Sequence, residues 1–449
     1  MTRLIALLAA IMFFSAGNAA TVAALRVGAA SVALEADDSM PIAGGILARF
    51  VKGQEGELRA TAFVLEKPSS ACLAIVSCDV LMLTRDLVDP VVAEIEESCG
   101  IPAANVLVHT THTHHAPSTI RVHGYGRDET FCRRMQEGIV KAVAAAKERL
   151  ADSLFTFQLG QEGTVGINSR LRLADGTIYW TGPRDDAVGP SGPFDPDLPV
   201  LAFRSPGGQL QALLYGHSTH TIGALDSSKR SPAFYGLVAQ DLEKELGGTA
   251  AFLEGASGST HNYLPPRESF ARIKQAVLKT FAEAQPRNVD RLAAMKRPFT
   301  FRVRTFDEAA EEKAVGDYCN KRLGRSAEPI IEIFRKMRKE LASQQGDERI
   351  TWLQVLQIGD VALAAVPAEF FTKFGLEIKK RSPFASTVVV ELSNDWIGYL
   401  PDREAHQLGG YQVWTGLHSY AEPGTGERIV DEVISMLEEL KRAGPLGRG

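Results

Sequence analysis

The stretch ANVLVHTTHTHHAP (residues 104–117) joins a short apolar strand to a loop that carries four histidines. The same change from strand to polar loop recurs in LLYGHSTH (213–220), AAFLEGASGSTHN (250–262) and VVVELSNDWIGY (388–399). Eight of the ten histidines lie in or near the first three of these loops. Since α/β folds build their sites in loops at strand ends, the pattern predicts an α/β fold of this kind.

The rest of the chain alternates short apolar strands with amphipathic helices. Strands are predicted over 58–66, 71–78, 104–110, 249–255 and 386–392, hairpins over 198–217 and 351–367, and helices over 129–150, 236–247, 369–381 and 427–442. A charged helical excursion follows from 308 to 345. There is no internal repeat and no low-complexity linker. We therefore expect one large domain over 25–445, with mixed β-sheets flanked by helices.

Composition and the N-terminus limit the function. The 449 residues carry a net charge of −5 with no block of like charge, which argues against a nucleic-acid partner. Residues 1–20 hold one Arg, an apolar run from Leu4 to Phe14 and then small residues, the pattern of a cleaved signal peptide. The run is too short to span a bilayer, and no later segment is apolar enough to do so. We expect a secreted or periplasmic protein without a transmembrane span in the mature chain.

The cysteines predict no zinc–thiolate framework, because they are scattered without CxxC spacing. They are Cys72, Cys78, Cys99, Cys132 and Cys319. Buried small hydrophobic residues are the simplest interpretation, and the pairing of one or two disulfides stays open.

The four clustered histidines divide into two faces if the chain stays extended past Val108. His112 and His114 then project to one side, and His109 and His115 to the other. An HxH pair is a common way to present two imidazoles to zinc, and hydrogen-bonded surface histidines are the alternative. In the second loop His217 and His220 diverge when extended; His217, directly after the strand, is the more rigidly held candidate.

The remaining candidates come from a Gly- and Ser-rich loop and from one acid. In LEGASGSTHNY, the hydroxyls of Ser257 and Ser259 and the ring of His261 are candidate catalytic groups, although a tight turn capped by hydroxyls fits equally. Glu369 follows an apolar strand and is expected at a helix start, where it either completes a mixed N/O zinc site or faces the helix dipole. Together these features favour a metallohydrolase.

Several of these stretches, in this order, resemble the neutral/alkaline, non-lysosomal ceramidase family. THTHHAP (111–117) is similar to the family's THTHSGP, GHST (216–219) to its second histidine segment, and VPAEFF (366–371) to PGEFTT. SNDWIGYLPDREAHQLGGYQVW (393–414) resembles its N-x-Y-x-x-Y-x-x-T-x-E-E-Y-x-x-Q-x-Y-E. The similarity extends over residues 27 to 440 and implies a ceramidase-like zinc hydrolase domain, without the family's C-terminal immunoglobulin-like domain.

The resemblance assigns a ligand set to one Zn²⁺: His112, His217, Glu369 and Tyr399. In the family a zinc-bound water attacks an amide carbonyl, while a second His and an Arg hold the oxyanion. These roles carry over to His114 and, with a shift of one position in the motif, to Arg170.

The sequence departs from the family in two places. His261 stands at the position of an important family Ser and Ser259 at that of an Asp, so His261 is a candidate acid/base group and Ser259 a catalytic candidate. The family's E-E-Y motif becomes Arg403-Glu404-Ala405-His406. These departures leave the metal site intact and put ceramide itself in question.

The predicted function is a zinc-dependent amidohydrolase that releases a fatty acid from ceramide or a related N-acyl substrate. The alternatives are an exported zinc hydrolase of another ester or amide, and a non-catalytic metal-binding relative. A lipid substrate implies an apolar groove and transient contact with a membrane surface. Aromatic side chains near the site loops that are candidates to line such a groove are Tyr125, Trp180, Phe194 and Trp396.

Overall fold

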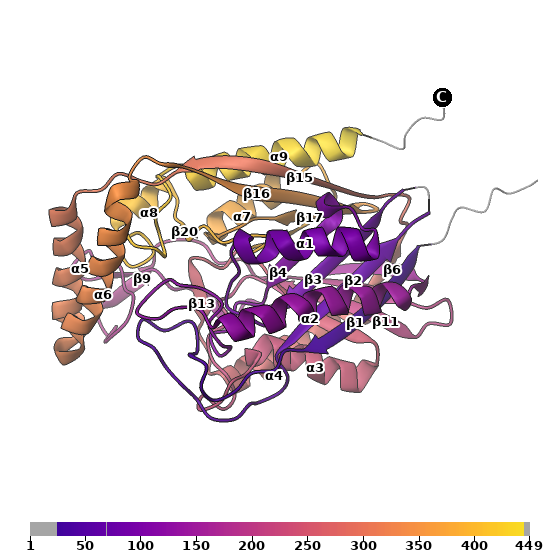
Figure 1. The fold of residues 1–449 in the computed structure, drawn as a ribbon, viewed down its shortest axis with the longest axis horizontal. Coiled ribbons are helices and arrows are strands. Elements are labelled where there is room, and N and C mark those ends of the chain that lie inside the picture. Colours follow the sequence, from indigo (N-terminus) through magenta and orange to yellow (C-terminus); the bar gives the residue numbers. More distant parts are fainter. Residues whose placement is uncertain (1–24, 69, 444–449) are drawn as a thin grey trace, which may run out of the picture.

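The computed structural model describes residues 25–68 and 70–443 as an α/β fold with three large sheets, each covered by helices on one face (Figure 1). The predicted fold class is confirmed. The predicted signal peptide over 1–20 lies outside the described residues. Within the described part, no helix is both long and apolar enough to cross a membrane.

The first sheet carries the histidine-rich loop. Its strand order is β4 (Val106–Thr110), β3 (Cys72–Cys78), β2 (Arg59–Glu66), β1 (Arg26–Ala33) and β5 (Ala151–Asp152). Helices α1 (Arg85–Cys99) and α2 (Glu129–Glu148) lie side by side over this sheet (Figure 1). β2 shows how the sequence specifies both faces: Phe63 points into the centre of the molecule, whereas Ala62 and Val64 pack on the helix side. Because both faces are buried, the middle of the strand, residues 62–65, is apolar on both sides.

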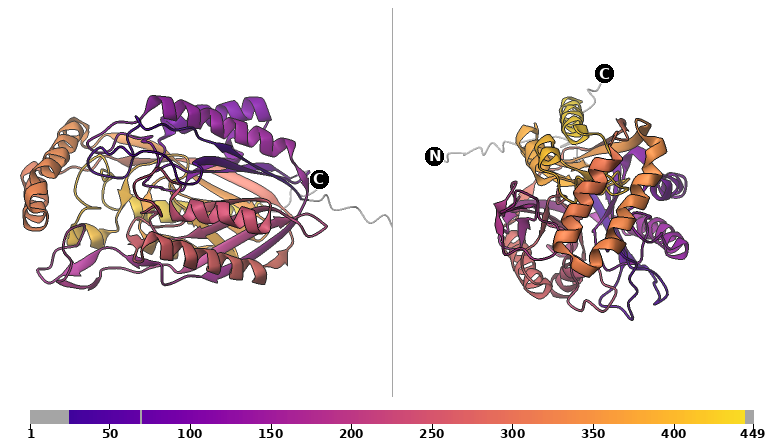
Figure 2. Two further views of the ribbon diagram at one scale, coloured as in Figure 1. Left: turned by 90° about the horizontal axis from the view of Figure 1, so that it is seen from below. Right: turned by 90° about the vertical axis from the view of Figure 1, so that its left-hand side faces the viewer.

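The second sheet has the order β12 (Thr249–Glu254), β11 (Leu210–His217), β10 (Asp197–Arg204), β6 (Leu154–Gln161) and β14 (Gln285–Arg287). Helices α3 (Ala233–Leu246) and α4 (Pro266–Glu283) cover it, on the side of the molecule opposite α1 and α2 (Figure 2, left). The third sheet has the order β15 (Leu292–Arg302), β16 (Glu348–Ile358), β17 (Val361–Ala365) and β19 (Ser386–Val390). Helices α7 (Thr372–Arg381) and α9 (Thr425–Arg442) cover the third sheet.

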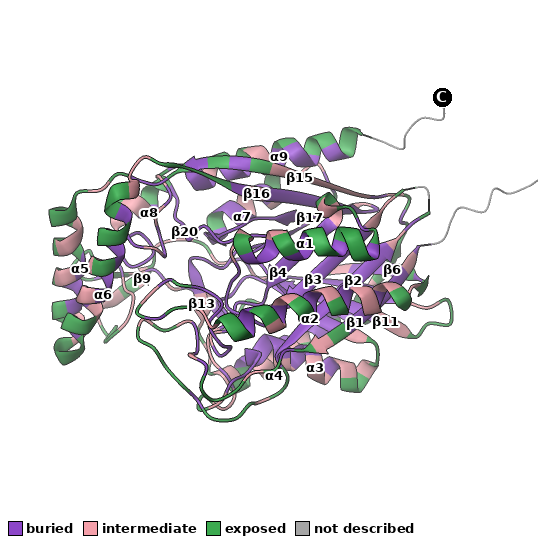
Figure 3. Cartoon of the chain, viewed as in Figure 1, coloured by how far each residue is buried: buried purple, intermediate pink, exposed green. Residues whose placement is uncertain are grey.

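The inner faces of the three sheets share one apolar core, which includes Phe63, Phe203, Leu356 and Val390. Figure 3 shows the strands buried and the helices exposed along their outer faces. Three short pairs complete the fold: β7 (Gly166–Asn168) with β13 (Thr260–Asn262), β8 (Leu171–Leu173) with β9 (Ala187–Pro190), and β18 (Glu369–Phe370) with β20 (Tyr399–Leu400).

The charged excursion forms α5 (Glu308–Arg322) and α6 (Ala327–Leu341), a helical pair at one end of the molecule (Figure 2, right). Gly324, with φ of 54°, lies in the turn between them, where the left-handed backbone favours glycine. A short helix, α8 (Arg403–Leu408), precedes the glycine pair 409–410. All five cysteines are free thiols and four are buried, which agrees with their interpretation as small hydrophobic residues and answers the open question of disulfide pairing.

The helix predicted over 369–381 begins only at Thr372. Glu369 lies instead in β18, because its segment pairs in parallel with β20, with Glu369 opposite Tyr399. The prediction of a helix start at Glu369 is therefore wrong.

Edge strands bring the site loops together. Each large sheet ends in a parallel pair: β3–β4, β11–β12 and β17–β19. The carboxyl ends of β4, β12 and β19 meet, since the Glu391 amide donates to the Glu254 carbonyl at 3.0 Å and the Asn394 amide to the Val108 carbonyl at 2.7 Å. The loops that follow these strands therefore converge on one point.

Candidate metal centre

Three histidines meet at this point. His112 and His114 come from the loop after β4, and His220 from the loop after β11. One ring nitrogen from each lies within 4.8 Å of the others, and the Nε2 atoms of His112 and His114 are 3.3 Å apart. His112 and His220 are fully buried, whereas His114 is partly exposed.

The second nitrogen of each ring fixes its tautomer. Nδ1 lies 3.0 Å from the Leu81 carbonyl in His112, 3.2 Å from the Gly44 carbonyl in His114 and 3.0 Å from the Ser257 carbonyl in His220. A carbonyl only accepts, so each Nδ1 carries the proton and donates it. Each Nε2 therefore turns an unshared electron pair toward the other two, an arrangement that a shared cation stabilises.

Two oxygen donors complete the cluster. The Glu369 Oε2 lies 3.3 Å from the His220 Nε2 and 3.6 Å from the His112 Nε2. The Tyr399 hydroxyl lies 3.1 Å from the His220 Nε2. Trp396 donates its indole N–H to the other Glu369 oxygen at 3.0 Å. Imidazole nitrogens with a carboxylate and a phenol oxygen form a donor set suited to a transition-metal ion such as zinc.

The protonation of the cluster matches metal binding. Burial raises the pKa of Glu369, but the neighbouring His220 and His112 rings outweigh burial and lower that pKa to about 2. Burial, together with the neighbouring His220 ring, lowers the pKa of His112 to about 4. Burial and the Glu369 carboxylate raise the pKa of the Tyr399 hydroxyl well above its usual value. At neutral pH the carboxylate is thus ionised and the His112 imidazole neutral.

The backbone bends sharply at His112, which adopts a φ of 58°. A non-glycine residue in this region costs on the order of 1–3 kcal/mol, and such strain persists only where the surroundings hold it. The extended chain assumed past Val108 therefore ends at Thr111, and the bend brings the rings of His112 and His114 to 4.8 Å between centroids.

The other two histidines of the stretch serve the framework, as expected from the two faces. His109 donates to the Glu391 carbonyl at 2.9 Å and accepts the Glu254 amide at 3.0 Å, so it ties β4 to the other two site strands. His115 lies against the Lys229 carbonyl at 3.3 Å.

His217 does not join the cluster. Its Nε2 lies 2.8 Å from the Glu162 carbonyl and its Nδ1 2.5 Å from the Tyr235 hydroxyl, so both nitrogens are occupied. As the last residue of β11, its side chain is set by the pleat and faces α3. His220, freed from the strand, takes the position expected for His217. We therefore correct the second histidine of the predicted set from His217 to His220.

His261 lies beside the cluster, and Ser259 does not. The ring of His261 is 4.8 Å from that of His220 between centroids, and it is partly exposed. Burial and the neighbouring His220 hold its pKa well below the usual value. The Ser259 hydroxyl accepts the Thr372 amide at 3.2 Å and donates to the Thr372 hydroxyl at 3.1 Å, so it supports the start of α7.

Arg170 is buried, and its guanidinium forms hydrogen bonds with other groups of the protein. It donates to the Gln412 side chain at 3.0 Å and to the carbonyls of Ala405 at 3.3 Å and Gly409 at 2.7 Å. Within the described residues, no hydrogen bond or ion pair joins Arg170 to the histidines. Arg170 and Ser259 instead line a separate cavity of about 190 Å³.

Sequence reasoning assigned no site role to Tyr411. Its ring lies 5.7 Å from that of Tyr399 and stacks on Trp180 at 4.7 Å, and its hydroxyl is 3.3 Å from His123 Nε2. We call Tyr411 and Trp180 the aromatic wall.

Tyr125, another groove candidate, supports His114 indirectly, because its hydroxyl accepts the Gly44 amide at 2.8 Å. Phe194 packs on His217, away from the cluster.

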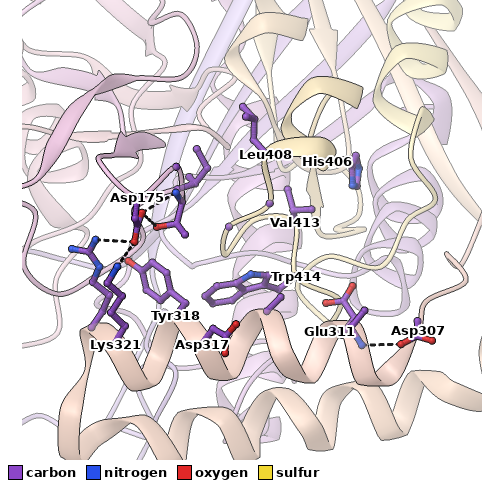
Figure 4. Close-up of a pocket in the computed structure, with 18 residues that line it drawn as sticks. Asp175, Asp307, Glu311, Asp317, Tyr318, Lys321, His406, Leu408, Val413 and Trp414 are labelled. Atoms are coloured by element: carbon purple, nitrogen blue, oxygen red, sulfur yellow. Dashed lines mark hydrogen bonds and ion pairs between the residues drawn. The ribbon is translucent and has the colours of Figure 1, made fainter.

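A cavity of about 630 Å³ lies between α5 and the loop after α8 (Figure 4). Trp414 and Tyr318 line it, and both rings also pack on Trp180. Acidic side chains, among them Glu311 and Asp317, surround the rings in Figure 4. None of the cluster residues lines this cavity, so it is distinct from the metal-type centre.

Fold and cluster together define a class: an α/β protein of three helix-covered sheets with a buried, histidine-rich centre at converging strand ends. No family model and no curated protein matches the sequence. Among solved structures, a ceramidase complexed with C2 is similar over 94% of this chain and 76% of its own, with a TM-score of 0.73 and 17% identity. The neutral ceramidase from Pseudomonas aeruginosa matches over 93% and 75%, with a TM-score of 0.71 and 18% identity. The resemblance found in the motifs is thus confirmed in the fold, which is that of the neutral ceramidases.

Proposed function

We propose that this protein is a zinc-dependent amidohydrolase that cleaves the amide of ceramide or a related N-acyl substrate. The observation that carries the proposal is the orientation of His112, His114 and His220, whose Nδ1 atoms face carbonyls while their Nε2 atoms converge beside Glu369 and Tyr399. The ceramidase fold around this donor set supports the choice of an amide substrate.

His112, His220, Glu369 and Tyr399 are the proposed ligands. Two neutral imidazoles, a carboxylate and a phenol oxygen suit zinc, which supplies Lewis acidity and lowers the pKa of water toward neutrality. Trp396 holds the free carboxylate oxygen of Glu369 and so orients the other toward the histidines.

The partly exposed rings are placed to face a substrate. His114 was expected to polarise the carbonyl, but its Nδ1 donates to Gly44 and leaves Nε2 as an acceptor; we propose that its ring orients the attacking water at the edge of the cluster. For His261 we propose an acid/base role toward the leaving amine, because it stands beside His220 and is partly exposed. We do not extend a catalytic role to Arg170 or Ser259, because their polar atoms are engaged elsewhere.

The substrate is proposed to carry an apolar chain, for which the aromatic wall beside Tyr399 offers a surface. Transient contact with a membrane surface and a secreted or periplasmic location belong to the same proposal. A hydrolase of another ester or amide remains the second candidate, since the same donor set would serve either bond.

The test is a substrate screen on the purified protein with and without chelator. We expect bound zinc, and release of fatty acid from ceramide that chelation abolishes and added zinc restores. Turnover only of non-lipid amides or esters would favour the second candidate. Bound zinc without turnover of any such substrate would indicate a non-catalytic relative, and absence of metal binding would refute the proposal.

A further inference from the structure

Glu391 is a fully buried carboxyl group just behind the metal-type cluster, at the end of β19. Its side chain accepts three hydrogen bonds: from the Ser257 hydroxyl at 2.7 Å, the Ser257 amide at 3.1 Å and the Phe370 amide at 2.7 Å. Three donors aimed at one buried carboxyl group match an ionised carboxylate. The residue thus joins three segments that are distant in the sequence.

Two of these segments carry proposed ligands or their supports. Phe370 follows Glu369 directly in β18, so the bond to its amide fixes the backbone next to the carboxylate ligand. Ser257 supports His220: the His220 Nδ1 lies 3.0 Å from the Ser257 carbonyl and 3.3 Å from its hydroxyl oxygen. One side chain therefore sets both the position of Glu369 and the orientation of His220.

The hydrogen bonds form a directed chain. His220 shares its Nδ1–H between the carbonyl and the hydroxyl oxygen of Ser257, and this hydroxyl donates in turn to Glu391. A carboxylate at the end of such a chain keeps the proton on Nδ1 and makes Nε2, which faces the cluster, a better electron donor. Removing an outer partner of this kind lowers metal affinity by roughly 10–100-fold.

Glu254 lies close to Glu391 and is also fully buried. The Thr221 hydroxyl donates to one of its oxygens at 2.9 Å, and the other has no partner among the described residues. Burial and the neighbouring Glu391 raise the pKa of Glu254 well above its usual value. Burial likewise raises the pKa of Glu391, so the two carboxyl groups do not both ionise. The three donors on Glu391, against one on Glu254, place the single charge on Glu391.

We propose that Glu391 and Ser257 are positioning residues that orient His220 and Glu369 for the metal ion. This inference rests on the proposed function only in requiring a metal at the cluster, and it goes beyond it by assigning residues that touch neither metal nor substrate.

The test measures metal binding rather than turnover. Ser257→Ala removes the hydroxyl and leaves the carbonyl; Glu391→Gln keeps an acceptor for the two amides but turns an N–H toward the Ser257 hydroxyl. We expect the zinc dissociation constant, measured against a chromophoric chelator, to rise by roughly 10–100-fold in each. The visible spectrum of the Co²⁺-substituted protein should also change.

Glu311→Gln is the matched control. Glu311 accepts the Thr415 amide at 3.0 Å and the Thr415 hydroxyl at 2.7 Å, the same pattern that Glu391 forms with Ser257, on α5. Its zinc affinity and Co²⁺ spectrum should equal those of the unmodified protein. Melting of the metal-free proteins reports folding, and if Glu391→Gln fails to fold, Ser257→Ala decides.

Two negative outcomes are distinguishable. Unchanged zinc affinity and Co²⁺ spectra in folded variants, with metal bound by the unmodified protein, would overturn the positioning role and leave the proposed function standing. Absence of zinc and Co²⁺ binding by the unmodified protein would overturn both.

Discussion

Two four-residue segments of the molecule have almost the same sequence, HTTH at 109–112 and HSTH at 217–220. In each, the first histidine belongs to a strand and has both ring nitrogens bonded within the protein. The second lies three residues later in the loop and turns its Nε2 toward the cluster. The first histidine thus stabilises the end of the strand through its hydrogen bonds. The second can point into the cluster because the sheet does not constrain its loop.

The two segments differ in how the loop is fixed. His112 bends back with a positive φ, and His114 follows it into the cluster. His220 has an ordinary φ and aligns with His261 through an isolated parallel bridge. One segment therefore supplies two rings through backbone strain, whereas the other supplies one ring whose orientation depends on Ser257.

The largest effects are expected when the two histidines of HSTH are replaced one at a time. His220→Ala should abolish zinc binding and zinc-dependent turnover with little loss of folding. His217→Ala should keep the metal but lower the free energy of unfolding by about 1–3 kcal/mol, because the buried Tyr235 hydroxyl and Glu162 carbonyl lose their partner. Metal content and denaturant unfolding check both, and zinc lost in the second variant but kept in the first would reverse the assignment.

A smaller effect is expected at Gly44, whose carbonyl supports His114. Its φ is 98°, and a Cβ there would overlap the His114 ring. Gly44→Ala should displace that ring and lower kcat by on the order of 100-fold, the usual cost of a 1 Å misplacement. Gly53→Ala is the control, since Gly53 has a φ of 73° and open space around it. Equal kcat in the two variants would remove His114 from the chemistry.

Trp396 should matter less. Trp396→Phe keeps most of the ring and removes the N–H that holds Glu369. We expect zinc affinity to fall roughly tenfold, since the carboxylate loses its outer partner. Competition with a chelator measures this change, and affinity equal to that of the unmodified protein would show that β18 alone positions Glu369.

The smallest effect on stability at pH 7 is expected from His109→Gln, because the Gln side chain can also donate to the Glu391 carbonyl and accept from the Glu254 amide. Burial lowers the pKa of His109 to about 4, so the unfolded chain takes up this proton first as the pH falls. The stability from the neutral ring is present above about pH 6.5 and is lost as the pH falls toward 4. Denaturant unfolding of the metal-free proteins should show a shallower loss between pH 7 and pH 4.5 in the variant, and parallel curves would contradict this account.

The sequence predicted most strands, because their apolar runs are bounded by clear turns, and it identified four of the five cluster residues. It did not distinguish a histidine at the end of a strand from one in the loop that follows, although their side chains point in different directions. His217 was preferred because it is held by the strand, yet that constraint turns it away from the cluster. The pairing of Glu369 with Tyr399, the bend at His112 and the chain through Ser257 to Glu391 depend on contacts between distant segments, which local patterns do not encode.

The parallel pairing of Glu369 with Tyr399 has a consequence for biosynthesis. The donor atoms come from residues 112, 220, 369 and 399, so the centre assembles only when nearly the whole chain is in place. Contacts of such long sequence separation form late in folding. A metal ion at this centre would therefore stabilise the completed fold and could not guide its early steps, and a nascent chain that ends before β20 would lack the centre.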